Sequence, residues 1–270
     1  MIELSASTST NERQMVRTVV VTGSGSGIGA AVRDHLENTG CRVVGADLHG
    51  AEIEADLATT EGRAALVDGV RELSPSGIDG IVANAGVLTT DSLAIRVNHF
   101  GAVATLNGLR PLLRQPSPRA ALVASRALLL PVNEAIVEAC LSGDEDLAVR
   151  LADDLTDGEI LYATSKRAVA RWLRRVAASG AWAGAGIPLN AVAPGSVSTP
   201  MIAHRTAEEQ ERKLRDRPMP LGGVANAREV ATAICWFLEP ANTKVAGQVL
   251  FVDGGGELLM RGDDIWDSVR

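Results

Sequence analysis

The sequence predicts a doubly wound α/β fold, in which helices cover both faces of a parallel sheet. Short apolar runs alternate with longer helical patterns from Arg17 onward, as in repeated strand–helix units. Several of these runs are apolar throughout, which is typical of parallel strands buried on both faces. No repeat or low-complexity linker divides the chain, so we expect a single domain at residues 16–270 behind a flexible tail at 1–15.

Seven strands and five helices follow from this alternation. The strands are predicted at residues 17–22, 42–47, 52–56, 79–84, 119–125, 188–194 and 248–253. The helices are predicted at residues 28–38, 60–73, 92–114, 159–179 and 226–238.

Two places break the alternation. Only four residues separate the second and third strands, which is too few for a crossover helix. Residues 126–158 form an insertion with helical patterns near 133–142 and 144–155. Three leucines, Leu147, Leu151 and Leu155, give the second of these helices one apolar stripe, which can cover the protein's own core or a partner subunit.

Composition excludes several classes of protein. The chain is 46% hydrophobic and 22% charged, and its net charge of −7 argues against a nucleic-acid-binding surface. Cys41, Cys140 and Cys235 have neither zinc-site nor disulfide spacing, so we expect no metal, a reducing compartment and buried thiols. No stretch reaches the ~18 apolar residues of a membrane span and the first residues lack a secretory signal, so a cytoplasmic protein without membrane association is expected.

A glycine-rich loop, TGSGSGIG, lies between the first strand and the first helix. Glycine permits a tight turn and the close approach of a pyrophosphate, which then meets the helix N-terminus. Such loops also make ordinary turns, but this position indicates dinucleotide binding. We therefore expect Gly23, Ser26, Gly27, Ile28 and Gly29 to contact a cofactor.

Polar residues at the carboxyl ends of the next three strands extend this predicted site. Asp47 can accept hydrogen bonds from both adenosine ribose hydroxyls and would repel a 2′-phosphate, which favours NAD over NADP; a solvated turn aspartate is the alternative. Asp56, followed by Leu57, is expected near the adenine amino group or in a turn ahead of a helix. Asn84, followed by Ala85 and Gly86, can contact the cofactor or tie two strand ends together, and both interpretations stay open.

The only tyrosine, Tyr162, stands four residues before Lys166 on a predicted helix, so both side chains project from one face. An ammonium about 4 Å from the phenol stabilises the phenolate by roughly 4 kcal/mol at an effective dielectric near 20. This would bring the phenol pKa from ~10 toward neutrality, where a general acid/base works best. The spacing alone also occurs by chance, as a half-exposed aromatic beside a solvated lysine.

Seven motifs occur in an order that resembles the short-chain dehydrogenase/reductase family, from Val19 to Gly255. They are TGSGSGIG, Asp47, NAG at 84–86, VNHFG around Asn98, VAS ending at Ser125, YATSK and PGSVSTP at 194–200. Each is weak alone, but the ordered set is specific, and it implies a Rossmann-type sheet with bound NAD.

The resemblance also implies roles for single residues. Tyr162 would exchange the hydroxyl proton, Ser125 would hydrogen-bond the substrate oxygen, Lys166 would also hold the nicotinamide ribose, and Asn98 would position a proton-relaying water. Pro194, Gly195, Val197 and Thr199 would seat the nicotinamide carboxamide. Taken singly, Ser125 can be a strand-end cap and Asn98 a helix residue bonded to backbone.

The chain departs from the common family pattern at its insertion. Thirty-seven positions separate Ser125 from Tyr162, against about a dozen in most members. In this long spacing and in the missing crossover helix, the chain is most similar to a subgroup of the family that acts on steroids. It is less similar to a subgroup that acts on coniferyl alcohol. In the former the insertion is similar to a dimerisation element, so we expect a homodimer (a tetramer is the alternative) with residues 133–155 at its interface. Alternatively, the insertion is a lid or a helix that covers the protein's own core.

The pocket walls are expected at residues 88–90, 126–130 and 201–202. These residues are mostly apolar, which suits a small-molecule alcohol or ketone with a bulky hydrophobic skeleton. The charged segment 205–217 is a candidate lid or a solvated helix. The arginines after Tyr162 are expected to point to solvent, and so is Arg126, for which contact with an anionic substrate tail is the alternative. The leading hypothesis is an NAD-dependent oxidoreductase of secondary alcohols and ketones on steroid-like rings. The alternatives are an aryl, cinnamyl or terpenoid alcohol dehydrogenase and, last, a non-catalytic NAD-sensing protein.

Overall fold

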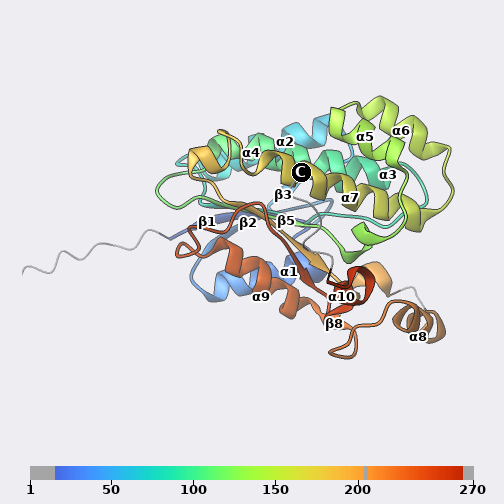
Figure 1. Ribbon diagram of the computed structural model, residues 1–270. Helices are drawn as coiled ribbons and strands as arrows, with labels where there is room; N and C mark the ends of the chain where they lie inside the picture. Colours follow the sequence, from blue (N-terminus) through green and yellow to red (C-terminus); the bar gives the residue numbers. More distant parts are fainter. Residues whose placement is uncertain (1–15, 204–205, 264–270) are drawn as a thin grey trace, which may run out of the picture.

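A seven-stranded parallel sheet forms the centre of the protein (Figure 1). The computed structural model describes residues 16–203 and 206–263, and the tail expected at 1–15 lies outside the described residues. The strands are β1 (Thr18–Thr22), β2 (Arg42–Asp47), β3 (Ile53–Glu54), β4 (Gly80–Ala83), β5 (Arg119–Val123), β6 (Leu189–Pro194) and β9 (Val249–Val252). All seven predicted strands are present, although β3 is shorter than expected.

The order of the strands, β3-β2-β1-β4-β5-β6-β9, reverses direction between β1 and β4. Ligands of open α/β sheets bind at this kind of switch point, outside the carboxyl ends of the strands. The observed order is that of a Rossmann-type sheet, so the predicted fold class is confirmed.

Helices cover both faces of the sheet (Figure 1). The helices α1 (Gly27–Asn38) and α9 (Ala227–Leu238) lie on one face, and α2 (Thr60–Leu73), α4 (Ala102–Leu109) and α7 (Gly158–Val176) lie on the other. Within β1, Val19 and Val21 pack in one core while Val20 packs in the other. This double burial is why consecutive residues of β1 are apolar and do not alternate with polar ones.

The segment predicted as one helix at 92–114 is divided into four. It consists of α3 (Leu93–Ile95), the π-helix η1 (Arg96–Gly101), α4 and the 3-10 helix η2 (Arg110–Leu112). The single helix was therefore a wrong prediction. The wider π turn allows Asn98 to face the loop after β4 while His99 bonds to the insertion on another side.

The insertion folds as the 3-10 helix η3 (Arg126–Leu129) followed by α5 (Glu134–Ser142) and α6 (Glu145–Asp153). Asn133 and Asp144 cap the two α-helices, accepting hydrogen bonds from Ile136 N at 3.2 Å and Leu147 N at 2.9 Å. The leucine stripe of α6 packs, partly buried, on a core of Ile95, Phe100, Ile136 and their neighbours, so it covers the protein's own core. The expected homodimer through residues 133–155 stays a prediction.

Arginines on α7 attach the insertion to the rest of the domain. Arg167 and Arg171 pair with Glu134, and Arg171 also pairs with Glu138 at 2.9 Å. The expected solvated face is present at Arg174 and Arg175, which are exposed, but Arg167 and Arg171 are only partly exposed, because two acidic residues of α5, one turn apart, lie opposite them.

The 3-10 helix η4 (Ala183–Ala185) lies between α7 and β6. The elements after β6 are the short strands β7 (Val197–Ser198) and β8 (Ala225–Asn226), η5 (Pro200–Ile202), α8 (Ala207–Asp216) and α10 (Gly256–Arg261). The helix expected within the charged segment is present as α8. None of the helices in the described part of the chain is long and apolar enough to cross a membrane.

Candidate active site

A cavity of about 360 Å³ opens at the carboxyl ends of the strands and brings the two predicted ends of the site together. The predicted residues that line it are Gly23, Ser26, Gly27, Ile28, Asp47, Asp56, Leu57, Asn84, Ala85, Gly86, Ser125, Tyr162, Lys166, Pro194, Gly195, Val197 and Thr199. Gly29 and Asn98 do not line the cavity but stand behind residues that do.

The glycine loop is shaped by close backbone contacts. Gly27 has φ +54°, in the left-handed region that favours glycine, and a side chain there would meet Thr199 at 3.2 Å. A Cβ on Gly29 would lie 1.9 Å from the carbonyl oxygen of Gly23, so only glycine allows α1 to begin this close to β1. Gly29 therefore has a packing role, and the loop presents its backbone to the cavity.

Asp47 ends β2 directly beside this loop. Its carboxylate accepts hydrogen bonds from Gly25 N at 2.8 Å and from Leu48 N at 2.7 Å. Each carboxylate oxygen retains a further acceptor position, so the side chain can hold a ribose hydroxyl while it fixes the loop.

Asp56 and Asn84 both make the structural contacts considered as alternatives. Asp56 accepts a hydrogen bond from Ala58 N at 2.9 Å, in the turn before α2. The side-chain nitrogen Nδ2 of Asn84 donates to the carbonyl oxygens of Thr22 and Gly23, at 3.0 and 3.1 Å, and so joins the end of β4 to the end of β1. Both residues also line the cavity, so the structural role does not remove them from the site.

Tyr162 and Lys166 lie one turn apart on α7, whose N-cap is Asp157. The Lys166 ammonium nitrogen lies 5.8 Å from the centre of the tyrosine ring and donates a hydrogen bond to Val123 O at 3.0 Å. Burial lowers the pKa of Lys166 to about 8, so most of the side chain is still cationic at neutral pH. The pair thus places a positive charge beside a half-buried phenol inside the cavity.

Asn98, on η1, joins the loop after β4 to α7. Its side chain makes a reciprocal pair with Val87, accepting from the amide nitrogen at 2.8 Å and donating to the carbonyl oxygen at 2.9 Å, and it donates to Ser165 Oγ at 3.0 Å. A Cβ on Gly86 would lie 3.0 Å from Asn98 Oδ1 and 3.2 Å from Lys166 Nζ. A side chain at Gly86 would crowd both polar groups, so glycine leaves room for them.

Ser125 follows the end of β5 and is the N-cap of η3. Its hydroxyl oxygen accepts a hydrogen bond from Ala127 N at 3.2 Å. The strand-end cap considered as an alternative is therefore present, and the same side chain lines the cavity with Tyr162. Capping fixes the orientation of a hydroxyl that can still donate its hydrogen to a ligand.

Arg126 does not point to solvent, contrary to expectation. It is 5% exposed, and its guanidinium donates to Arg217 O at 3.0 Å and Pro218 O at 3.1 Å and lies 3.6 Å from Asp253. The carbonyls after α8 and the carboxylate after β9 satisfy the charge, which allows its burial. Arg126 thus ties the end of α8 to the end of β9 at the edge of the cavity.

Several cavity residues escaped sequence reasoning. Of the expected walls, Leu88, Arg126, Ala127, Leu130, Met201 and Ile202 line the cavity, whereas Thr89, Thr90, Leu128 and Leu129 do not. Lys213 and Arg217, from the charged segment considered as a lid or a solvated helix, also line it, and Glu159 and Met260 line it without having been predicted. Glu159, in the first turn of α7, forms ion pairs with Lys213 and with Arg217, the latter at 2.8 Å, and so joins α7 to the charged helix α8. Nothing in the local sequence indicated this pairing.

Comparisons with known proteins match the same architecture. Residues 147–257 match a family described as Enoyl-(Acyl carrier protein) reductase. The chain is 33% identical over 253 residues to a 3-alpha-hydroxysteroid dehydrogenase/carbonyl reductase of Comamonas testosteroni, covering 90% of this chain and 97% of that protein. It is 30% identical to a cis-4-hydroxycyclohexanecarboxylate dehydrogenase of Sinomonas cyclohexanicum, covering 88% and 96%. The solved structure of the 3-alpha-hydroxysteroid dehydrogenase from Pseudomonas sp. B-0831, complexed with NADH, superposes with a TM-score of 0.84 at 41% identity, covering 91% of this chain and 99% of that one.

Proposed function

The chain belongs to the short-chain dehydrogenase/reductase family of alcohol/ketone oxidoreductases, and on this premise we propose that it interconverts a secondary alcohol and a ketone on a bulky hydrophobic substrate, with NAD as cofactor. The observation that carries the proposal is one cavity that reaches from Asp47 and the glycine loop to Tyr162 and the buried cation of Lys166.

The residues at the nucleotide end fit a dinucleotide. The loop after β1 leads into the N-terminus of α1, and backbone this close to a cavity can receive a pyrophosphate. Asp47 beside the loop favours a ribose with two free hydroxyls, hence NAD rather than NADP. When bound, the nicotinamide supplies or accepts the hydride.

The residues at the reacting end fit proton exchange. In the direction of ketone reduction, the Tyr162 hydroxyl gives its proton to the carbonyl oxygen as hydride reaches the carbonyl carbon; oxidation runs in reverse. The Lys166 cation stabilises the resulting phenolate, and the Ser125 hydroxyl hydrogen-bonds the substrate oxygen. Asn98 bonds to Val87 and to Ser165, which precedes Lys166 on α7, and this position suits a relay that returns the proton to solvent.

The wall of the reacting end supports a hydrophobic substrate. The residues Leu88, Leu130, Met201, Ile202 and Met260 contribute apolar side chains there. The two relatives at 33% and 30% identity are named for a hydroxysteroid and a ring-bearing hydroxy acid, which supports a hydroxyl on a ring.

A screen for NADH formation tests this function. The purified protein is incubated with NAD and hydroxysteroids, cyclic secondary alcohols or cinnamyl alcohols, with NADP in parallel. We expect turnover of ring-borne secondary alcohols with NAD. A clear preference for a linear primary alcohol would contradict the proposed substrate class, and a clear preference for NADP would contradict the role of Asp47.

A further inference from the structure

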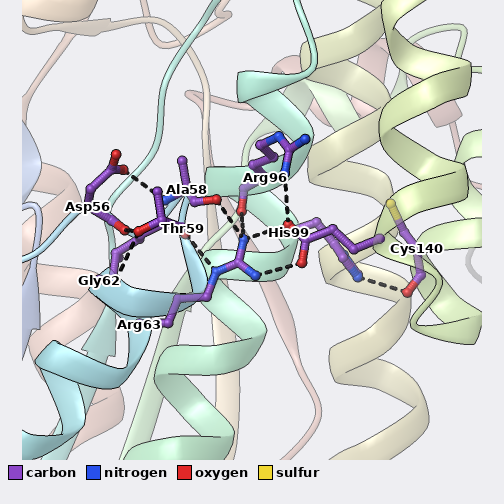
Figure 2. A network of polar contacts seen from close by, with 10 residues as sticks. Asp56, Ala58, Thr59, Gly62, Arg63, Arg96, His99 and Cys140 are labelled. Atoms are coloured by element: carbon purple, nitrogen blue, oxygen red, sulfur yellow. Dashed lines mark hydrogen bonds and ion pairs between the residues drawn. The ribbon is translucent and has the colours of Figure 1, made fainter.

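Arg63, in the first turn of α2, joins three parts of the protein (Figure 2). Its Nε donates to Leu57 O at 2.8 Å, after β3, and its Nη2 donates to Arg96 O at 3.1 Å, on the π-helix η1. Both terminal nitrogens donate to the carboxylate of Glu145 on the insertion, at 2.6 and 2.8 Å. Arg63 and Glu145 therefore form a bidentate ion pair, whose geometry is specific, and their side chains are only 13% and 26% exposed.

His99 makes a second contact between η1 and the insertion. Its Nε2 lies 3.0 Å from Cys140 O on α5 (Figure 2), and because a carbonyl only accepts, this nitrogen carries the hydrogen. The ring is 1% exposed, and burial lowers its pKa to about 4, so the imidazole is neutral. Phe100, the next residue, packs into the core of the insertion.

Asn98 lies between these contacts on the same short π-helix. Its side chain faces away from the insertion, toward Val87 and Ser165, and its neighbour Val97 lines the cavity. A π turn is rare, and it occurs frequently at functional sites. The insertion and Arg63 therefore hold one side of η1 while the candidate site uses the other.

We propose that Arg63, Glu145 and His99 are positioning residues that hold Asn98 against Val87 and Ser165, the residue before Lys166. The helices inserted between Ser125 and Tyr162 are then part of the catalytic framework, because they fix Asn98, which acts together with Ser125, Tyr162 and Lys166. The inference rests on the proposed function, since it concerns the part that Asn98 plays there. A displacement of about 1 Å in such a site can cost a hundredfold in rate.

The test compares two carboxylates of the same insertion. Glu145→Ala removes the partner of Arg63, whereas the control Glu138→Ala removes only ion pairs to Arg171 and Arg175 on α7. We expect Glu145→Ala to lower kcat about tenfold with little change in the KM for NAD. The control is expected to stay within about twofold of wild type. Equal losses in the two variants would overturn the proposal.

A double variant separates positioning from a general loss of stability. If Glu145 acts through Asn98, Glu145→Ala should have no further effect on kcat in an Asn98→Ala background. The same tenfold loss in both backgrounds would overturn the proposal. If Glu145→Ala proves too unstable to assay, Glu145→Gln retains the side-chain shape and one acceptor oxygen and is expected to show a smaller loss of the same kind.

A readout without turnover makes the two proposals distinguishable. The Val87 amide donates to Asn98 Oδ1, so its hydrogen exchange reports whether Asn98 is in place. We expect faster exchange at Val87 in Glu145→Ala and wild-type exchange in Glu138→Ala; unchanged exchange in both would overturn the positioning role. If the wild type oxidises none of the screened alcohols, the proposed function fails while the exchange result still decides the inference.

Discussion

The two ends of the cavity are built in different ways. At the nucleotide end, backbone amides and short side chains make the contacts, as in the hydrogen bond from Gly25 N to Asp47. At the reacting end, long side chains reach between elements far apart in the chain, as Lys166 does to Val123 and Arg126 to Pro218. Contacts made by the backbone are retained in most side-chain substitutions, whereas a group of charged side chains is disrupted when any one of them is replaced. Changes at the two ends should therefore affect different kinetic constants.

The largest effect is expected at the reacting end. Tyr162→Phe removes only the hydroxyl and keeps the ring beside Lys166. Since a positioned acid or base contributes up to about 10⁴-fold, we expect kcat to fall by roughly a thousandfold or more. The affinity for NADH, measured by fluorescence titration, should change by less than about twofold because the nucleotide end is untouched.

A retained kcat in Tyr162→Phe would remove the hydroxyl from the mechanism. A lost affinity for NADH would show instead that the two ends are not separate. The comparison between the ends would then fail, even if the loss of turnover were as large as expected.

At the nucleotide end, a change should alter binding more than chemistry. Asp47→Asn keeps an oxygen that can accept from Gly25 N but loses the charge and one acceptor. A hydrogen bond to a charged group contributes about 1.5–3 kcal/mol, so we expect the KM for NAD to rise about tenfold to a hundredfold, with kcat nearly unchanged. The KM for NADP should fall, because the repulsion of a 2′-phosphate is gone.

Steady-state kinetics with both cofactors checks this prediction. A loss of kcat equal to the rise in KM would mean that Asp47 shapes the reacting end as well. An unchanged ratio of NAD to NADP use would instead remove Asp47 from cofactor selection.

The same contrast explains what the sequence could predict. The glycine loop, Asp47 and the spacing of Tyr162 and Lys166 are local patterns. The loop and Asp47 lie at the ends of predicted strands, and Tyr162 and Lys166 lie on one predicted helix. The burial of Arg126 was not predictable, because its partners at Arg217, Pro218 and Asp253 come together only in the folded chain. The π turn at Asn98 was missed because its residues follow an ordinary helical pattern, whereas the contacts of Arg96 with Arg63 and of His99 with Cys140 join segments that are distant in the sequence. Tertiary contacts between distant segments are what local periodicity omits.

The smallest effect is expected at the ion pairs between α7 and α8. Glu159 pairs with Lys213 and Arg217, but its side chain is 49% exposed, and exposed ion pairs contribute only ~0–1 kcal/mol. Arg126 also holds the end of α8 through the carbonyl oxygens of Arg217 and Pro218. We therefore expect Glu159→Gln to raise the substrate KM by about twofold to fivefold without a loss of kcat.

Salt makes this last prediction specific. The difference in KM between wild type and Glu159→Gln should shrink as ionic strength rises, because salt screens an exposed pair. Glu211→Gln is a matched control, since it removes an ion pair to Arg215 within α8 that does not reach the cavity. If the control raises the KM as much as Glu159→Gln, the effect comes from the stability of α8 alone. If Glu159→Gln lowers kcat as much as Tyr162→Phe does, α8 contributes to the chemical step and does not only line the cavity.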